Sequence, residues 1–363
     1  MYLTAVLFVG TLAAIVAAYA IHRKRQLVPE IPAIKPEPPT LPPPVDSTNA
    51  RATYSTETIE SLRGEWLKLA FGVARFDYQI FGEHLEVLER IDDAIETSAQ
   101  QREYFPRRPM LLPKLLQSLN DTETTRQELV QLILQDPSLA GAVLQRANSA
   151  FYRIGRERVD SLDRAVSLLG VDGLRGLLAT AIMQPVFRLQ KGYFDQFAPL
   201  SWEQAQYAAA AAEKYAALER SVDPFVAQLL AVLEPLARIV IFRLTLDKYR
   251  ESPNVLPRPE VFIRAIQTHS EAVAVRIAAT WELSDDALEV LQLQAKHVAP
   301  NEMTQLAQSV YYSRLTAELL SLVSRSVCPE DVALDVLTDQ GLTAARANAL
   351  FTAPQIAAQI AKG

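Results

Sequence analysis

Four histidines and one cysteine are the side chains with the strongest ligand chemistry in this sequence. They are His22, His84, His269, His297 and Cys328. Imidazoles combined with carboxylates can hold a metal ion that activates water, and a thiolate can act as a nucleophile. The sequence contains no glycine-rich phosphate loop, nucleophilic serine elbow, Cys-x-x-Cys pair or His-Glu-x-x-His helix. We therefore predict no catalytic residue, no cofactor and no metal site.

His269 and His297 are open to two interpretations. They could form a residual metal or ligand pair. Alternatively, His269 caps or pairs locally at a helix start, and His297 lies near a helix C-terminus, where positive charge is favourable. We favour this structural role. Asn148 also suits a helix end, where its amide can serve free backbone carbonyls, and Cys328 suits a helix boundary better than a reactive thiol.

Composition favours a helical globular protein that does not bind nucleic acid. Of 363 residues, 49% are hydrophobic, 21% are charged and only 12 are glycine, which suits packed helices better than a turn-rich β fold. The formal net charge of -6 argues against a nucleic-acid partner. A single cysteine excludes an intrachain disulfide and fits a reducing compartment.

The N-terminal segment predicts a membrane anchor. Residues 2–21 form an uncharged, mostly apolar run that is long enough to cross a bilayer as a helix, and Arg23, Lys24 and Arg25 follow it. A cleaved signal peptide is the alternative, but its positive charges would precede the apolar run. The positive-inside rule then predicts a single-pass protein of the bacterial inner membrane, with the bulk of the chain in the cytoplasm.

The chain after the anchor predicts a linker and then helices. Residues 22–54 are basic at first and then rich in proline, which predicts an extended, semi-rigid linker. Residues 55–104 have apolar residues at helical spacing and predict a helical prelude. No sustained period-2 alternation follows, and the cluster Val240–Phe242 is too short to predict a strand. We therefore predict an all-α fold.

Helix-start signals recur along the chain. A hydroxyl followed three residues later by Glu or Gln predicts a capping box, and Asp followed by proline predicts a helix start. Gly170 predicts a helix end, because glycine tolerates a positive φ. Ala208–Ala212 predicts a closely packed central helix, with a groove for a partner as the less favoured alternative. The predicted starts are the capping boxes Thr125–Glu128 and Ser201–Gln204, the Asp-Pro pairs at 136–137 and 223–224, and Asp160, Asp172, Ser284 and Asn301.

A series of motifs runs through residues 105–300. Its first half is Leu112-Pro113, Asp136-Pro137-Ser138-Leu139, Asn148-Ser149-Ala150-Phe151-Tyr152 and Leu168-Leu169-Gly170. A weaker second half has Trp202, Thr268-His269-Ser270-Glu271, Trp281-Glu282-Leu283 and His297. In this order and spacing the motifs resemble the HDOD domain, the HD-related output domain of bacterial signalling proteins. The resemblance implies a multi-helical domain over residues 105–300, with Trp202 opening a helix, and a C-terminal helical extension over residues 301–363.

The same resemblance implies that the metal site of HD-type hydrolases is absent. Such enzymes gather histidines and an aspartate around one or two metal ions. Where related proteins have Leu-Leu-His-Asp, this sequence has Leu229-Leu230-Ala231-Val232, and Gln204 stands where a histidine is common. No His-Asp dipeptide occurs in the chain. We therefore expect a degenerate HD-superfamily domain that is not an enzyme.

The expected function is a non-catalytic, membrane-tethered signalling or scaffold module. It would contact the membrane through residues 2–21 and bind cytoplasmic or membrane signalling proteins at the cytoplasmic face. Two alternatives stay open. One is a metal-dependent nucleotide or cyclic-dinucleotide phosphohydrolase with unusual ligands, and the other is a non-catalytic nucleotide receptor.

Overall fold

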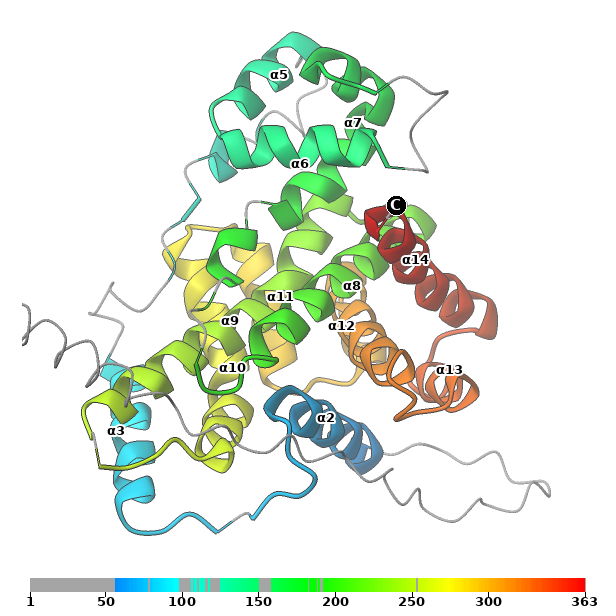
Figure 1. The fold of residues 1–363 in the computed structure, drawn as a ribbon. Coiled ribbons are helices and arrows are strands. Elements are labelled where there is room, and N and C mark those ends of the chain that lie inside the picture. Colours follow the sequence, from blue (N-terminus) through cyan, green and yellow to red (C-terminus); the bar gives the residue numbers. More distant parts are fainter. Residues whose placement is uncertain are drawn as a thin grey trace, which may run out of the picture. The chain divides into compact units, whose positions relative to one another are not determined.

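The structure is a computed structural model that describes residues 56–77, 79–97, 106, 108–109, 111–114, 117, 125–149, 158–181, 183–187, 189, 192–252 and 254–362. The predicted anchor at 2–21, the predicted linker at 22–54 and His22 lie outside the described residues. The helices, labelled in Figure 1, are α2 Thr56–Phe71, α3 Glu83–Thr97, α5 Arg126–Leu134, α6 Pro137–Ala147, α7 Leu162–Ala181, α8 Phe197–Leu218, α9 Pro224–Arg250, α10 Pro259–Thr280, α11 Asp285–Ala295, α12 Gln305–Val323, α13 Glu330–Asp339 and α14 Ala344–Lys362, with the short 3-10 helices η1 Gln184–Phe187 and η2 Pro300–Glu302.

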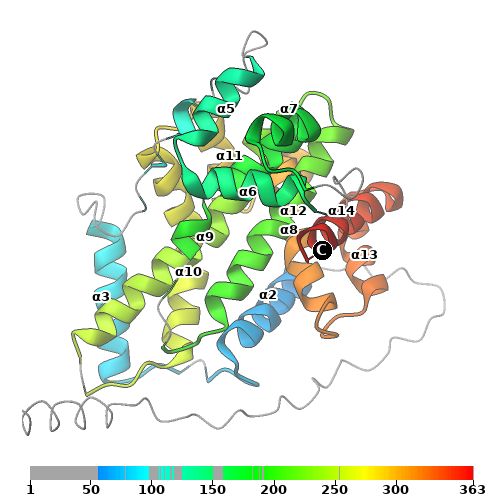
Figure 2. The ribbon, with the colours of Figure 1, turned by 45° about the horizontal axis from the view of Figure 1, so that its top comes forward.

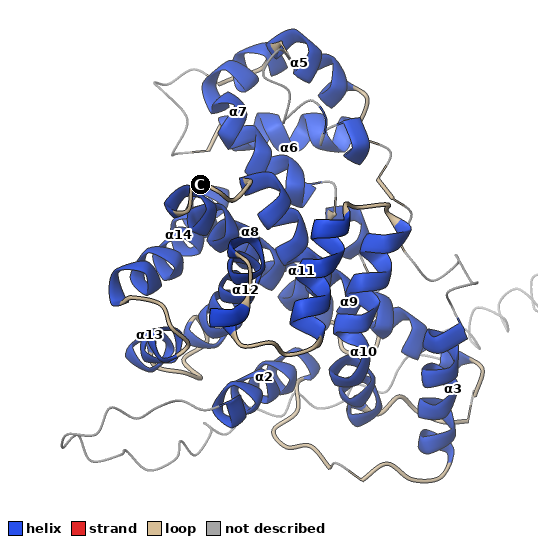
Figure 3. Cartoon of the chain, turned by 180° about the vertical axis from the view of Figure 1, so that it is seen from behind, coloured by secondary structure: helices blue, strands red, loops and turns tan. Residues whose placement is uncertain are grey.

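Two long helices, α8 and α9, pack against each other and organise the remaining helices. The helices α2, α12 and α14 lie against α8, whereas α3 and α10 lie against α9. The helices α5 and α6 pack on each other and on α7, which in turn contacts α8 and α9 (Figure 2). Every regular element that the structure describes is a helix (Figure 3), so the prediction of an all-α fold is confirmed.

Helix α9 is buried along nearly its whole length. Its 27 residues span about 40 Å. Among the described helices, it alone is long and apolar enough to cross a membrane, but 94% of that apolar stretch is buried inside the protein. Here α9 is therefore a core helix. Asp223 caps it, as predicted, by accepting a hydrogen bond from the Val226 amide at 2.9 Å.

Several other predicted helix boundaries are confirmed. Thr125 and Glu128 form both hydrogen bonds of a capping box at the start of α5. Ser284 caps α11, and Asp136 accepts an amide hydrogen bond at the start of α6. Gly170 has a φ of 66° and interrupts α7, which agrees with the predicted helix end. These signals act between neighbours in the chain, so they do not depend on how the helices pack.

The predicted capping box at Ser201 and Gln204 is wrong. Helix α8 begins one turn earlier, at Phe197, and Gln196 precedes it without a side-chain cap. The Phe197 side chain is fully buried in the core, and its packing extends the helix toward the N-terminus. Ser201 and Gln204 therefore lie in the buried interior of α8, and Trp202 does not open the helix.

Two further predicted starts are displaced. Asn301 lies in η2, and Thr304 caps α12 through a hydrogen bond that its hydroxyl accepts. Asp160 lies one residue before Ser161, whose hydroxyl accepts the first amide hydrogen bond of α7. In both places a nearby hydroxyl is in the position from which it can reach a first-turn amide.

The alanine-rich stretch of α8 is a packed interior, as predicted. Ala208 and Ala212 have no exposed surface, and they contact helices α9 and α12 rather than solvent. Small side chains allow these helix axes to approach closely. We call the group formed here the alanine cluster, which consists of Ala208, Ala212, Ala216, Val222, Ala227, Ala231 and Ala317.

The prelude helices and the C-terminal helices share the core of the central pair. Trp66 of α2 is 1% exposed and packs edge-on against Phe197 of α8, with ring centroids 6.3 Å apart. Phe71 of α2 packs against Phe242 of α9, at a centroid distance of 6.1 Å. One continuous apolar cluster therefore extends from α2 to α14.

Candidate functional site

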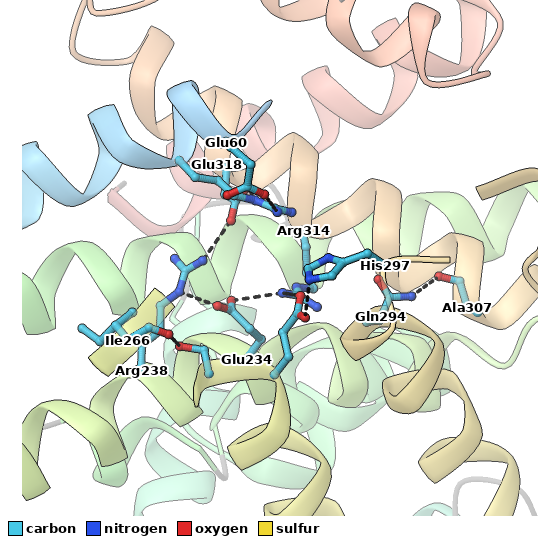
Figure 4. Close-up of polar contacts among 12 residues, drawn as sticks. Glu60, Glu234, Arg238, Ile266, Gln294, His297, Ala307, Arg314 and Glu318 are labelled. Atoms are coloured by element: carbon cyan, nitrogen blue, oxygen red, sulfur yellow. Dashed lines mark hydrogen bonds and ion pairs between the residues drawn. The ribbon is translucent and has the colours of Figure 1, made fainter. Parts of the chain in front are cut away.

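Charged side chains from α2, α9 and α12 meet a buried glutamine of α8 in the core, and all of the charged ones except Arg63 are buried. Charged residues are rarely buried unless they are paired, so this group is the first candidate for a functional site. Figure 4 shows how several of them point toward one another between the helices. We call the group the charge network, and it consists of Arg63 of α2, Gln204 of α8, Glu234 and Arg238 of α9, and Arg314 and Glu318 of α12.

Helical spacing places the charges of α9 and α12 opposite each other. Glu234 and Arg238 are four residues apart, and so are Arg314 and Glu318, so each pair occupies one face of its helix. The order is Glu then Arg on α9 but Arg then Glu on α12. Facing positions therefore carry opposite charges, with Arg238 against Glu318 and Arg314 against Glu234.

Arg238 is the centre of the charge network. Its Nη1 donates to Gln204 Oε1 at 2.7 Å, its Nη2 donates to Glu318 Oε1 at 2.9 Å, and its Nε donates to Glu234. The second oxygen of Glu318 accepts from Arg63 Nε at 3.0 Å. A single guanidinium thus joins α8, α9 and α12, and Glu318 extends the link to α2.

The other end of the charge network is looser. Arg314 Nη2 lies 3.7 Å from Glu234 Oε2 and 3.6 Å from Glu271 Oε1, so these are ion pairs without a direct hydrogen bond. Arg314 Nε is buried and has no partner. Beyond it, His297 Nε2 lies 3.7 Å from Glu271 Oε2, and the His297 side chain is 70% exposed. The row of charges therefore runs from the buried Arg238 toward the surface at His297.

Electrostatic interactions keep Arg238 and Glu318 of the charge network ionised. Burial would raise the pKa of the Glu318 carboxyl, but Arg63, Arg238 and Arg314 together outweigh burial and hold that pKa below its usual value. Burial would likewise lower the pKa of Arg238, but Glu234 and Glu318 keep it raised. The Glu318 carboxylate is therefore neutralised by guanidinium groups and is a poor proton acceptor.

We expect the lowered pKa of Glu318 to make stability depend on acid. A carboxyl whose pKa is lower in the folded state stabilises the fold above its unfolded-state pKa of about 4.3, and the contribution is lost as pH falls through the folded-state pKa. Urea unfolding between pH 7 and pH 3 should show this loss. In Glu318→Gln the curve should be flatter below about pH 4.3, whereas Glu251→Gln, at a 48% exposed side chain, should match the parent. Equal acid dependence in both variants would contradict the assignment.

His269 and His297, the two histidines considered as a ligand pair, do not lie together. The prediction that His269 caps or pairs locally at a helix start is wrong. His269 lies inside α10, and its Nε2 contacts Asp92 Oδ1 of α3 at 2.6 Å. His297 does lie just beyond the C-terminus of α11, with a φ of 50°. The ion-pair partner of His297 is Glu271, which lies two residues after His269 on α10. Residues two apart on a helix face different sides, so His269 and Glu271 point in different directions. Within the described ranges, no three His, Cys, Asp or Glu side chains are grouped to hold a metal ion.

Asn148 and Cys328 have structural surroundings. Asn148 Nδ2 donates to the carbonyls of Leu144 at 2.8 Å and Val159 at 2.7 Å, and its Oδ1 accepts from the Val159 amide at 2.8 Å. This agrees with the prediction that its amide serves free backbone groups at a helix end. Burial raises the pKa of the Cys328 thiol to about 11, which is unfavourable for a nucleophile.

The charge network was not predicted from the sequence, although a signal for it exists. Glu234 and Arg238 interrupt an otherwise apolar run on α9 at a spacing of four residues. Charges in such a run are buried with the rest of the helix and therefore require partners. The spacing of Arg314 and Glu318 on α12 offers the complementary charges, but the sequence does not show that α12 lies beside α9.

The positions that the resemblance assigns to metal ligands lie one turn before Glu234 on α9. Ala231 belongs to the alanine cluster, beside Ala208 and Ala317, and has no exposed surface. Val232 is also fully buried, in the main apolar core. Methyl groups therefore occupy this part of the interior.

Comparisons with known proteins identify a family through one family model and a similar fold in solved structures. The family model for the HDOD domain matches residues 105–297. A candidate metal-dependent phosphohydrolase from Shewanella amazonensis SB2B has 12% identity and a TM-score of 0.52, over 75% of this chain and 99% of that one. An HDOD domain protein with unknown function from Geobacter sulfurreducens has 18% identity and a TM-score of 0.52, over 77% of this chain and 96% of that one. No curated protein matches this sequence.

Proposed function

This chain belongs to the HDOD domain family, and from that premise we propose that it is a non-catalytic signalling module, tethered to the bacterial inner membrane, that binds partner proteins at the cytoplasmic face. The observation that carries the non-catalytic part is the burial of Ala231 and Val232 among apolar side chains. Neither residue has a ligand atom for a metal ion. The closest charges along α9 are Glu234 and Arg238, and they already pair with each other.

A metal-dependent phosphohydrolase is the second candidate, because one similar structure is described as a candidate enzyme of that class. The purified full-length chain can be assayed with manganese, magnesium and zinc against nucleotides and cyclic dinucleotides. We expect no turnover and no stoichiometric metal. Turnover that His269→Ala and His297→Ala abolish would establish the hydrolase instead. Calorimetry with cyclic dinucleotides would separately reveal a non-catalytic nucleotide receptor.

Exposed apolar side chains near α3 support the protein-binding part of the proposal. Phe81 is 66% exposed and Leu256 is 64% exposed. Tyr249 links their two segments, since its hydroxyl lies 3.0 Å from His84 Nδ1 and accepts from the Arg258 amide at 3.3 Å. Exposed apolar side chains on two neighbouring segments favour contact with another protein.

Phe81→Asp combined with Leu256→Asp is expected to weaken capture of a partner from solubilised membranes on the order of tenfold, because an apolar contact is replaced by charge. Both positions are exposed, so the free energy of unfolding should change by no more than about 0.5 kcal/mol per substitution. Leu134→Asp is the matched control, since Leu134 is 51% exposed on α5. Quantitative capture followed by mass spectrometry measures the effect. Equal losses in the variant and the control would argue against this surface.

Removal of residues 2–21 is expected to move the chain from the membrane fraction to the soluble fraction, because these residues carry the predicted anchor. The measurement is fractionation followed by immunoblotting. Reporter fusions at the C-terminus test the orientation. A fluorescent reporter should be active and an alkaline phosphatase reporter should be silent, and phosphatase activity would refute the cytoplasmic placement.

A further inference from the structure

The last helix, α14, lies against α8, α12 and α13 (Figures 1 and 2). Its buried side chains include Ala347, Leu350, Phe351 and Pro354. Their spacing of three, one and three residues forms a single apolar stripe along the helix. We call the surface of α8, α12 and α13 that contacts this stripe the α14 seat. An amphipathic helix therefore fills the α14 seat from the edge of the protein.

The polar contact of α14 with α8 adds little stability, and a proline interrupts the hydrogen bonding within α14. Arg346 pairs with Glu219 at the end of α8, but the side chains are 40% and 22% exposed, and such pairs contribute little. Pro354 lies inside the helix, where it has no N–H to donate to the carbonyl of Leu350 and its ring crowds that carbonyl. Helices at the edge of a fold whose internal hydrogen bonding is interrupted open at a lower free energy than central ones.

A tight turn connects α14 to α13. Gly341 has a φ of 108°, and a Cβ at this position would lie 3.1 Å from the Tyr312 hydroxyl oxygen. The Gly341 amide donates to the Thr338 carbonyl at 3.0 Å, and the Leu342 amide donates to the Leu337 carbonyl at 3.3 Å. Short hinges of this kind favour exchange of the helix that follows them, because straightening a few residues carries the whole helix away.

We propose that α14 exchanges between two copies of this chain, so that the α14 of each copy occupies the α14 seat of the other. The choice of occupant follows from fit, because the seat already matches Ala347, Leu350, Phe351 and Pro354 in the monomer. An exchanged dimer keeps these contacts and differs mainly in the hinge and in the loss of the intramolecular connection. The exchange does not depend on membrane anchoring, although two copies held in one membrane would favour it.

Cross-linking between two full-length variants tests the exchange. Residues 219 and 346 face each other across the contact between α8 and α14. A mixture of Glu219→Cys and Arg346→Cys chains is treated with a short bismaleimide in mild detergent. A covalent heterodimer requires α14 of one variant to lie on α8 of the other. We expect at least about tenfold more heterodimer than from Glu219→Cys mixed with Arg250→Cys, whose thiol is exposed at the end of α9.

The unmodified chain is the control for cross-linking through its own cysteine, Cys328, which is buried. A heterodimer yield no higher than that of the Arg250→Cys pair would overturn the proposal. Failure here would leave partner capture and membrane anchoring untouched, because neither is measured.

Pro354→Ala provides a second measurement. It restores the missing N–H and removes the crowding, so α14 should open less often and the heterodimer should form more slowly, by about tenfold or more. Thr352→Ala, at an exposed position on the same helix, is the control and should leave the rate unchanged. An unchanged rate in Pro354→Ala would mean that the cross-links do not arise from opening of α14, and it would also overturn the proposal.

Discussion

Arg238→Met is expected to lower the free energy of unfolding by about 3–5 kcal/mol. The guanidinium donates to Gln204, Glu234 and Glu318, and Arg238 is only 7% exposed. Its loss leaves two carboxylates buried with reduced compensation, and such charges are costly in a medium of low polarity. Methionine keeps an unbranched side chain in the core, so most of the loss should come from charge rather than from a cavity. Urea unfolding at pH 7 measures it.

Arg250→Met is the matched control for Arg238→Met, because Arg250 is on the same helix with a side chain that is 68% exposed. Its effect should stay within about 0.5 kcal/mol. The pair Arg238→Met and Glu318→Gln should be non-additive by about 1–3 kcal/mol, since the two residues share a hydrogen bond at 2.9 Å. A loss below about 1 kcal/mol in Arg238→Met would show that the charge network does not hold the core together.

Ala231→His combined with Val232→Asp is expected to lower the free energy of unfolding by about 4 kcal/mol or more, or to prevent folding. The substitutions introduce the His-Asp pair of HD-type sequences at two positions with no exposed surface. The imidazole overfills the alanine cluster, and the new carboxylate is placed in the apolar core without a designed partner. Circular dichroism, urea unfolding and soluble yield measure the effect.

The control for this pair is Ala217→His with Leu218→Asp, which places the same dipeptide at exposed positions near the end of α8. Its effect should remain below about 1 kcal/mol. Zinc or manganese should restore no stability to the buried pair. Strong restabilisation by either metal would contradict this expectation, because it would mean that the remaining ligands of a metal site already surround Ala231 and Val232.

The charge network also shows which segments fold together. Arg238 lies inside the range that the family model matches, but Glu318 lies after that range and Arg63 lies before it. Trp66 of α2 lies over the Arg238 guanidinium, with its ring centroid 4.8 Å from Cζ. The centre of the HDOD domain in this protein is therefore completed by helices on both sides of the matched residues.

The sequence by itself determined the features that depend on neighbouring residues. The caps at Thr125, Asp223 and Ser284 could be predicted because each side chain bonds an amide three residues away. The helix end at Gly170 and the packed stretch Ala208–Ala212 followed in the same way from intrinsic residue properties. The absence of metal-binding side chains at Ala231 and Val232 was also visible in the sequence.

Only the tertiary structure decided which distant residues became partners. Gln204 has the spacing of a capping residue, but burial of Phe197 extended α8 and turned Gln204 toward Arg238. Arg238 and Glu318 are 80 residues apart, and His269 and Asp92 are 177 apart. Local propensity cannot specify such pairs, because a buried charge takes whichever opposite charge the packing of helices brings within reach.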